Sequence, residues 1–365
     1  MSEAEAAVPP SRSAPKWRRY LSRILVVASL YFALLVYPVV RIIGLVAPET
    51  RLDTIALLAI IVLPILGRVL YERAPSAFTR GTSAVALTWL GVCFQIFPLM
   101  IVFEIANLVF DIPGPVAGWV LIGISTALTL IGFVNAQVLH VRSVPLSGGA
   151  QVRGRILVQV SDVHIGSRSP RLLRRIVDKV NAARPDYVVI TGDLIDFSGI
   201  TREQLSALGT FAAPCYFAIG NHERYVDLTA ICERLRSLGV IVLRNEAAIA
   251  GPFQMIGVDD VDKPTTVAKT IDSIGVSRDH YSVLLYHRPD GFEASAQHRI
   301  DLMLAGHTHA GQIVPFNFIV RKVYPKLHGV YRDGASTMYV SPGTGTWGPI
   351  LRLGSRSEIT RFVFE

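Results

Sequence analysis

The chain has 365 residues, a net charge of +8 and a hydrophobic content of 51%. Its mean hydropathy of +0.42 argues against a wholly soluble protein. No run of Lys and Arg resembles a nucleic-acid-binding arm, so no nucleic-acid partner is expected. The three cysteines, Cys93, Cys215 and Cys232, form no CxxC pattern. A cysteine zinc site is therefore disfavoured, and a disulfide framework is not expected.

Four apolar segments between Ile24 and Leu139 are candidates for transmembrane helices, because a bilayer core of about 30 Å needs about 20 apolar helical residues. The segments are 24–46, interrupted by Arg41, then 54–67, 84–103 and 112–139. The second has only 14 residues before Arg68 and is the weakest, so three spans remain an alternative. We expect a basic cytoplasmic tail (1–20), a membrane region of about four helices (21–141), a linker (142–152) and a second domain (153–365).

The distribution of Lys and Arg predicts the orientation of the spans. Basic residues are frequent in the tail, in the second connection and beyond the fourth span. The first connection has only Arg41 and Arg51, and the third has none. This pattern predicts a multi-pass integral membrane protein with both termini, and so the second domain, in the cytoplasm. The basic tail would contact anionic membrane lipids.

Two features of this half allow other interpretations. Arg18 and Arg19 precede an apolar stretch and are compatible with an export signal, but no clear cleavage site follows and further spans come after it. Three polar residues inside the spans could mark a transport pathway: Glu104, Asn107 and Asn135. We favour the interpretation that they lie at span ends or form interhelical hydrogen bonds.

Strand and helix patterns alternate after residue 150. Helices are predicted at 170–183, 201–208 and 228–239, the first from its apolar stripe. Strands are predicted at 155–160, 186–191, 215–219, 240–243, 253–258, 282–286, 301–305, 337–340 and 359–364. The fold class is therefore an N-terminal α-helical transmembrane region followed by an α/β domain. The later run of strands predicts a two-sheet β sandwich flanked by helices.

Metal-ligating residue types follow five of these predicted strands, where ligands gather in α/β sheets. They are Asp162 and His164, Asp193, Asn221 and His222, His287, and His307 and His309. In an extended segment, residues two apart face the same side, so each D-x-H or H-x-H pair could reach bound ions. Any one of these motifs alone is more often an ordinary turn or a hydrogen-bonded histidine. Their repetition at successive strand ends favours one shared metal site.

The ordered set D-x-H, G-D, G-N-H-E, H and G-H-x-H resembles the calcineurin-like metallophosphoesterases over residues 155–345. The surrounding "QVSDVHIG", "LLYHRPD" and "GHTHAGQI" are similar to a branch with membrane-anchored or exported phosphodiesterases. One departure is Ala310, where a second glycine is common, and it should not disturb the ligands. The four-span half lies outside the family pattern, so the resemblance says nothing about its role.

The resemblance implies hydrolysis of a phosphodiester or pyrophosphate at two metal ions. It implies that Asp162, His164 and His309 bind one ion, that Asn221, His287 and His307 bind the other, and that Asp193 bridges them. It also implies that His222 is catalytic, and that its protonated imidazole stabilises charge or protonates the leaving group. A ligand set without thiolate suits Mn, Fe, Zn or Co. We further expect Asp196 or Glu223 to orient ligating histidines.

The substrate is less well specified. The segment 321–332, "RKVYPKLHGVYR", is interpreted as a surface loop or as a basic, aromatic rim that meets anionic lipid head groups. The rim would favour a lipid phosphodiester or pyrophosphate, including nucleotide-linked lipids such as those cleaved by the UDP-diacylglucosamine pyrophosphatases of this superfamily. A soluble cyclic nucleotide is the second choice. A catalytically idle membrane sensor or scaffold with the same fold also stays open, although no ligand position is missing.

Overall fold

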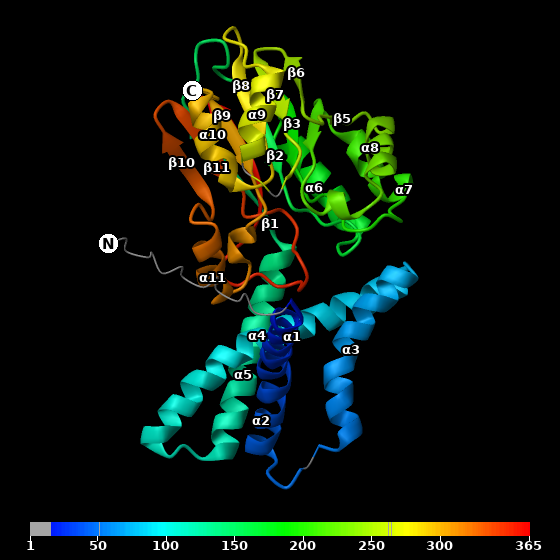
Figure 1. Cartoon of the computed structure of the whole chain (residues 1–365), viewed down its shortest axis with the longest axis vertical. Coiled ribbons are helices and arrows are strands. Elements are labelled where there is room, and N and C mark those ends of the chain that lie inside the picture. The colour runs from blue at the N-terminus through cyan, green and yellow to red at the C-terminus, as the bar shows by residue number, and fades with distance from the viewer. Residues whose placement is uncertain (1–15, 51, 262, 264) are drawn as a thin grey trace, which may run out of the picture.

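A computed structural model of the protein describes residues 16–50, 52–261, 263 and 265–365. A helical membrane part and an α/β domain are joined end to end (Figure 1). Of the predicted basic tail, residues 1–15 lie outside the described residues, and residues 16–20 already belong to the first helix.

Four long apolar helical segments form the membrane part, which confirms the four-span prediction. The first span comprises α1 (Lys16–Tyr31), a π-helical turn η1 (Phe32–Val36) and α2 (Tyr37–Val46). The others are α3 (Thr54–Arg73), α4 (Ala77–Phe110) and α5 (Gly114–Gln137). The second span does not stop at Arg68, because Arg68 Nε donates to Glu72 Oε1 one turn later at 2.8 Å. This i,i+4 pair lets the helix continue to a full 20 residues.

The polar residues within the spans have structural partners. The Arg41 Nε group donates to Glu104 Oε1 at 2.6 Å. The Asn107 side chain accepts the N–H of Ile112 at 2.8 Å, where α4 gives way to the next connection. Asn135 Nδ2 donates to the Arg352 carbonyl at 3.3 Å. These bonds confirm that the three residues satisfy interhelical and terminal groups, which is how polar side chains are accommodated in a bilayer.

The second domain is the predicted two-sheet sandwich. One sheet has the order β1-β12-β2-β3-β4-β5 and the other β10-β11-β9-β8-β7-β6. The strands of the first are β1 (Leu139–Leu146), β2 (Ile156–Val160), β3 (Tyr187–Thr191), β4 (Cys215–Ala218), β5 (Ile241–Val242) and β12 (Ser357–Phe364). Those of the second are β6 (Glu246–Ala250), β7 (Phe253–Gly257), β8 (Tyr281–Leu285), β9 (Leu302–Ala305), β10 (Gly329–Asp333) and β11 (Ser336–Val340).

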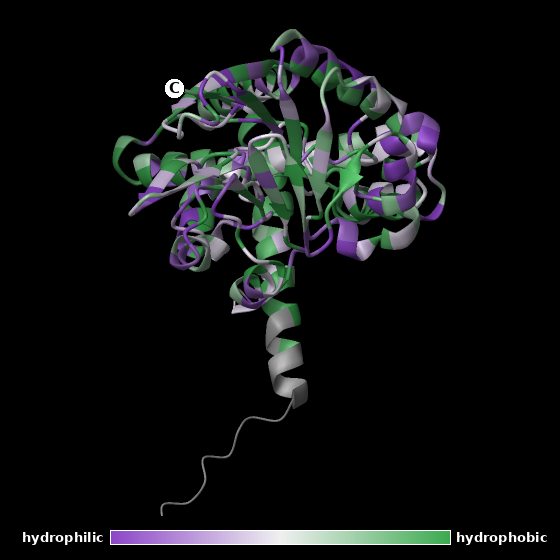
Figure 2. Cartoon of the chain, turned by 90° about the horizontal axis from the view of Figure 1, so that it is seen from above, coloured by the Kyte–Doolittle hydropathy of each residue, from purple (hydrophilic) through white to green (hydrophobic). Residues whose placement is uncertain are grey.

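Three apolar layers hold the sandwich together. Buried side chains such as Leu157, Phe253 and Phe362 fill the space between the sheets. The helices α6 (Pro170–Ala182), α7 (Arg202–Leu205) and α8 (Leu228–Ser237) cover the first sheet, and α9 (Thr265–Ile274) and α10 (Phe292–Gln297) cover the second. Seen from above, the strands are mainly hydrophobic and the hydrophilic residues gather on the outer helices (Figure 2).

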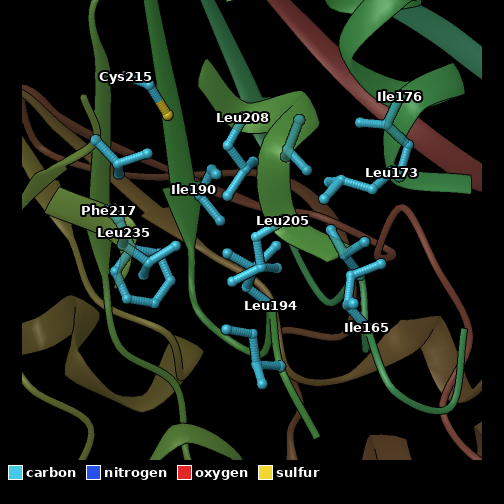
Figure 3. Close-up of a cluster of buried hydrophobic side chains, with 14 of the residues drawn as sticks. Ile165, Leu173, Ile176, Ile190, Leu194, Leu205, Leu208, Cys215, Phe217 and Leu235 are labelled. Carbon is cyan, nitrogen blue, oxygen red and sulfur yellow. The ribbon is translucent and has the colours of Figure 1, made fainter. Parts of the chain in front are cut away.

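The helix α6 shows why the sequence pattern was informative here. Its predicted stripe is buried: Leu172, Leu173, Ile176, Val177 and Val180. Pro170 stands in the first turn, where its missing N–H has no helical partner to lose. Figure 3 shows Leu173 and Ile176 of this stripe in the same apolar cluster as Ile190 and Ile165. Each such burial contributes about 1.5–3 kcal/mol, which holds the helix against the sheet.

The prediction of a linker at residues 142–152 is wrong for residues 142–146. These residues belong to β1, which follows α5 after the single residue Val138 and pairs in parallel with β12. Val144 and Leu146 are buried between the sheets, and this short alternation was masked by neighbouring Ser, Pro and Gly. The strands β6 and β10 and the helices α9, α10 and α11 (Phe316–Val323) were not predicted either.

The domain is attached to the spans by more than the α5–β1 junction. The Tyr71 hydroxyl of α3 donates to the Gly166 carbonyl at 2.6 Å, and its ring packs edge-on against Phe197. The Arg352 N–H donates to the Gly132 carbonyl of α5 at 2.8 Å. Contacts from two different spans restrain the rotation of the domain about a single connection, so its loops keep one face toward the membrane part.

Candidate metal centre

All the residues predicted from the sequence as metal ligands come from loops at one edge of the sandwich. The parallel strands β2, β3 and β4 of one sheet and β8 and β9 of the other end there. These side chains form three groups, and within each group the potential ligand atoms all lie within 4.8 Å of one another. The groups are Asp162, His164 and His309; His164, Asp193 and His222; and Asp193, His287 and His307. Because the groups share members, they form one continuous cluster. Asn221 lines the same cavity as His222 and His307.

Hydrogen bonds behind the cluster orient two of the imidazoles. His164 Nδ1 lies 2.7 Å from Asp196 Oδ1, and His287 Nδ1 lies 2.8 Å from the Thr191 carbonyl. Both partners are acceptors, so each Nδ1 carries a hydrogen when the ring is neutral, and each Nε2 presents a lone pair to the cluster. The carboxyl group of Asp196 therefore has the orienting role expected for it.

The inward-facing nitrogen and oxygen atoms of the cluster lie close to one another. His164 Nε2 lies 3.1 Å from His309 Nε2, and His287 Nε2 lies 3.2 Å from His307 Nδ1. Asp193 Oδ2 is 3.1 Å from His287 Nε2. The buried Asn221 Oδ1 and His309 Nδ1 have no hydrogen-bond partner. Facing lone pairs and an unpartnered amide oxygen are what a cation between them would satisfy, so this donor set fits metal ions.

The charges in the cluster lead to the same conclusion. Burial alone would lower the pKa values of His164 and His287, but the carboxylates raise them to about 9 and about 10. The pKa of His164 is raised chiefly by the charge of Asp196, and the pKa of His287 chiefly by that of Asp193. Burial lowers the pKa of His307 to about 3, assisted by the charge of His287. The cluster thus needs positive charge beside its carboxylates, and protons supply it where metal does not.

The ligand loops do not have the extended geometry assumed from the i, i+2 spacing. Asp162, His164, Asp193, His307 and His309 all have φ values between 49° and 71°, in the left-handed region. A residue with a Cβ atom is disfavoured there by about 1–2 kcal/mol. Left-handed turns rather than strand pleats therefore direct these side chains into the cluster, and such strain is concentrated at functional sites.

Small residues make the cluster geometrically possible. A Cβ atom on Gly220 would collide with the Asp193 carboxylate, and one on Gly306 would collide with Ser161 and Asp162. Glycine is therefore required at both positions because a larger side chain would not fit, and not because of the backbone angles there. Ala310 has a φ of 53°, which explains why glycine is common at its position in the resembling family. Its left-handed conformation leaves the neighbouring His309 in the cluster.

Three supporting residues were not assigned these roles from the sequence. Glu223 contacts backbone rather than histidine, and accepts the N–H groups of Asp193, Ile195 and Gly220 at 2.8–2.9 Å. Burial, with a contribution from Asp193, raises the pKa of Glu223 to about 7. Of the two residues expected to orient a ligating histidine, Asp196 contacts one and Glu223 does not. Glu223 fastens the two ligand loops to each other.

The other two supporting residues come from late in the chain. The Arg352 side chain is buried and donates to the carbonyls of Gly345 and Gly343 at 2.7 and 3.1 Å. It also donates to the His309 carbonyl at 3.4 Å, and burial lowers its pKa to about 9. The Tyr324 hydroxyl lies 2.9 Å from His307 Nε2. No spacing rule connects Arg352 or Tyr324 to the ligand motifs, so only the packing reveals them.

The domain that contains this cluster is similar to known proteins. Residues 156–311 match the family model described as calcineurin-like phosphoesterase. A Danio rerio "transmembrane protein with metallophosphoesterase domain" is 35% identical over 66% of this chain and 61% of its own length. A Helicobacter pylori "uncharacterized metallophosphoesterase" is 35% identical over 56% of this chain and 58% of its own. A similarly named Aquifex aeolicus protein is 31% identical over 62% of this chain and 90% of its own. The chain thus spans about three fifths of the first two relatives.

Proposed function

We propose that this chain, which belongs to the calcineurin-like metallophosphoesterase family, is a membrane-embedded enzyme that hydrolyses a phosphodiester or pyrophosphate with two metal ions. The observation that carries the proposal is the convergence of imidazole nitrogens and carboxylates in one cluster, beside a cavity that Asn221, with its unpartnered oxygen, also lines. A catalytically idle scaffold has no need of a complete and strained donor set.

One ion would be held by Asp162, His164 and His309, and the other by Asn221, His287 and His307. Asp193 would serve both, since it shares one donor group with His164 and another with His287 and His307. Mn, Fe, Zn and Co suit this mixture of nitrogen and oxygen donors. When bound, two such ions would acidify a water molecule and neutralise charge on the phosphoryl group.

His222 would supply the proton that the leaving group needs. Its side chain is partly exposed to the cavity, whereas His164 and His287 are fully buried. His222 Nδ1 lies 2.7 Å from Asp196 Oδ1, which leaves Nε2 available for the substrate. As the water oxygen bonds to phosphorus and the ester bond breaks, Nε2–H of the protonated ring transfers its proton to the departing oxygen. Because Asp196 contacts both His222 and His164, it would fix the position of the proton donor relative to that of a metal ligand.

The segment 316–323 supports a substrate at the membrane surface. It forms the helix α11 rather than the surface loop considered for residues 321–323. Phe318, Ile319 and Val323 are exposed, and Arg321 and Lys322 lie in the last turn. Exposed apolar residues beside basic ones are typical of a helix lying at a lipid interface. A lipid phosphodiester or lipid pyrophosphate is therefore favoured over a soluble cyclic nucleotide.

Removal of metal tests the proposed reaction. We expect the purified full chain to bind two metal ions and to hydrolyse bis(p-nitrophenyl) phosphate. Chelation should lower turnover at least about a hundredfold, because the charge neutralisation by metal is lost. Restoring Mn, Fe, Zn or Co, each in a separate sample, should recover activity with at least one of them. A chain carrying two ions without hydrolysing this ester, a nucleotide pyrophosphate or a lipid phosphodiester would instead be a scaffold.

Protease accessibility tests the proposed cytoplasmic location of the domain. The start of α1, the α3–α4 connection and the end of α5 all lie on the domain side of the spans (Figure 1). These are the segments that the Lys and Arg distribution assigns to the cytoplasm. In sealed inverted vesicles, added protease should therefore digest the domain. Protection of the domain until detergent opens the vesicles would mean that it lies on the opposite side.

A further inference from the structure

A cavity of about 480 Å³ connects the metal centre to the membrane spans. At one end it is lined by metal-centre residues, including His222 and His309. Its other walls include Leu34 of η1 and Leu90 and Phe94 of α4. The cavity is therefore shared by the two halves of the chain, and its polar groups are concentrated at the metal end.

A second, apolar groove of about 720 Å³ lies between the first two spans. Its lining includes Val27 and Phe32 from the first span and Ile61 and Ile65 from α3. Val27 and Phe32 are 66% and 57% exposed, so the groove opens on the face that would meet lipid chains. Tyr31 lines both the groove and the cavity. The two spaces therefore adjoin at one side chain, whose hydroxyl donates to the Ile61 carbonyl at 2.6 Å.

The backbone of the first span is irregular at this junction. The π-helical turn η1 follows Tyr31 directly and contains Leu34 and Leu35, both of which line the cavity. π-Helical turns are rare and occur frequently at functional sites. On the opposite wall, Phe316 of α11 packs edge-on against Phe94 at a ring separation of 5.8 Å. Helices from the spans and from the domain thus form the wall together.

We infer that the substrate is a phosphoester of a membrane lipid, with its phosphate at the metal centre and its hydrocarbon chain in the cavity and the α1–α3 groove. This inference rests on the proposed function and specifies its substrate class. A soluble nucleotide would leave its sugar and base against apolar walls that offer few hydrogen bonds. A hydrocarbon chain gains free energy from those walls in proportion to the apolar area it buries.

Two chromogenic phosphodiesters test the inference, because they differ only in chain length. They are the p-nitrophenyl esters of hexadecyl phosphate and butyl phosphate, presented in the same nonionic detergent micelles. The metal-loaded full chain should have a kcat/KM at least about tenfold higher for the hexadecyl ester, a preference that burial of a few methylenes can supply. Equal kcat/KM for the two esters would overturn the inference. Hydrolysis of neither would instead contradict the proposed function.

Bulky substitutions locate the chain-binding path. Leu34→Trp, in the cavity, and Val27→Trp, in the exposed groove, should each reduce the chain-length preference to within about threefold. Leu130→Trp is the matched control, because Leu130 is 61% exposed on α5 and lines neither space. The chain-length preference of the Leu130→Trp variant should equal that of the unmodified protein. If Leu34→Trp fails to fold, Val27→Trp still provides the test. An unchanged chain-length preference in folded Val27→Trp protein would overturn the inference that the hydrocarbon chain lies in the groove.

Photocrosslinking provides a readout without turnover. A hexadecyl phosphate carrying a diazirine near the end of its chain should label peptides from residues 24–36 and 54–65, even in metal-free protein. Leu34→Trp should reduce that labelling, and Leu130→Trp should not. Labelling of α5 (Gly114–Gln137) as strong as that of residues 24–36 would indicate ordinary lipid contact and overturn the inference.

Discussion

Replacing Asp193 by alanine is expected to leave at most one metal ion per chain and to lower kcat/KM for bis(p-nitrophenyl) phosphate at least about a thousandfold. Asp193 belongs to two of the three donor groups, and its Oδ2 atom lies 3.1 Å from His287 Nε2. Its loss therefore weakens both proposed ion sites at once. Metal analysis of the purified variant, together with steady-state kinetics, measures both effects.

A structural effect must be separated from the loss of metal. Asp193 Oδ1 accepts the N–H of His222 at 2.9 Å, so its removal leaves a donor unsatisfied at a cost of about 1–3 kcal/mol. Thermal unfolding of metal-free protein measures this part. Asp178→Ala is the control, since Asp178 is exposed on α6. Two tightly bound ions and ordinary turnover in the Asp193→Ala variant would contradict the bridging role.

Replacing His222 by alanine is expected to lower kcat by about 10²–10⁴-fold while leaving two metal ions bound. The substitution should change kcat but not the metal content, because His222 would donate a proton, whereas the metal ligands around it remain in place. Asp196 keeps His164 as a partner at 2.7 Å, so the fold should change little. His280→Ala is the matched control, because His280 contacts Ser277 away from the metal centre.

The leaving group makes the His222 test more specific. A p-nitrophenolate needs little protonation, whereas an alkoxide needs it strongly. The His222→Ala variant should therefore lose more activity against an alkyl leaving group than against p-nitrophenyl. An equal loss for both leaving groups would assign His222 a positioning role, and turnover matching the unmodified chain would exclude it from the reaction.

Local patterns predicted much of the fold. Hydropathy identified all four spans, because apolar length is a property of each segment by itself. Boundaries were less accurate where charges pair, as at Arg68 and Glu72. The strand β1 was missed because its partner β12 is more than two hundred residues away in the chain. A strand whose stability comes from distant pairing has a weak local signal.

The residue types of the proposed site were also readable in advance, but their geometry was not. The order of Asp, Asn and His motifs after successive strands named every member of the three donor groups. The spacing suggested extended segments, whereas the loops adopt left-handed turns. Short motifs report which donors are present, and the surrounding packing determines their backbone angles. Arg352 and Tyr324 illustrate the same point, since both meet the cluster from separate late segments.

By itself, the sequence determined that this protein has four apolar spans, a two-sheet domain and donors suited to metal ions. Hydropathy, periodicity and ligand chemistry are local properties, so they need no knowledge of distant contacts. Only the tertiary structure decided that His164 and His309, 145 positions apart, bring their Nε2 atoms within 3.1 Å. It also decided that the first and third spans form a wall of the cavity that reaches His309. Contacts of this kind depend on how helices and sheets pack, which no single segment specifies.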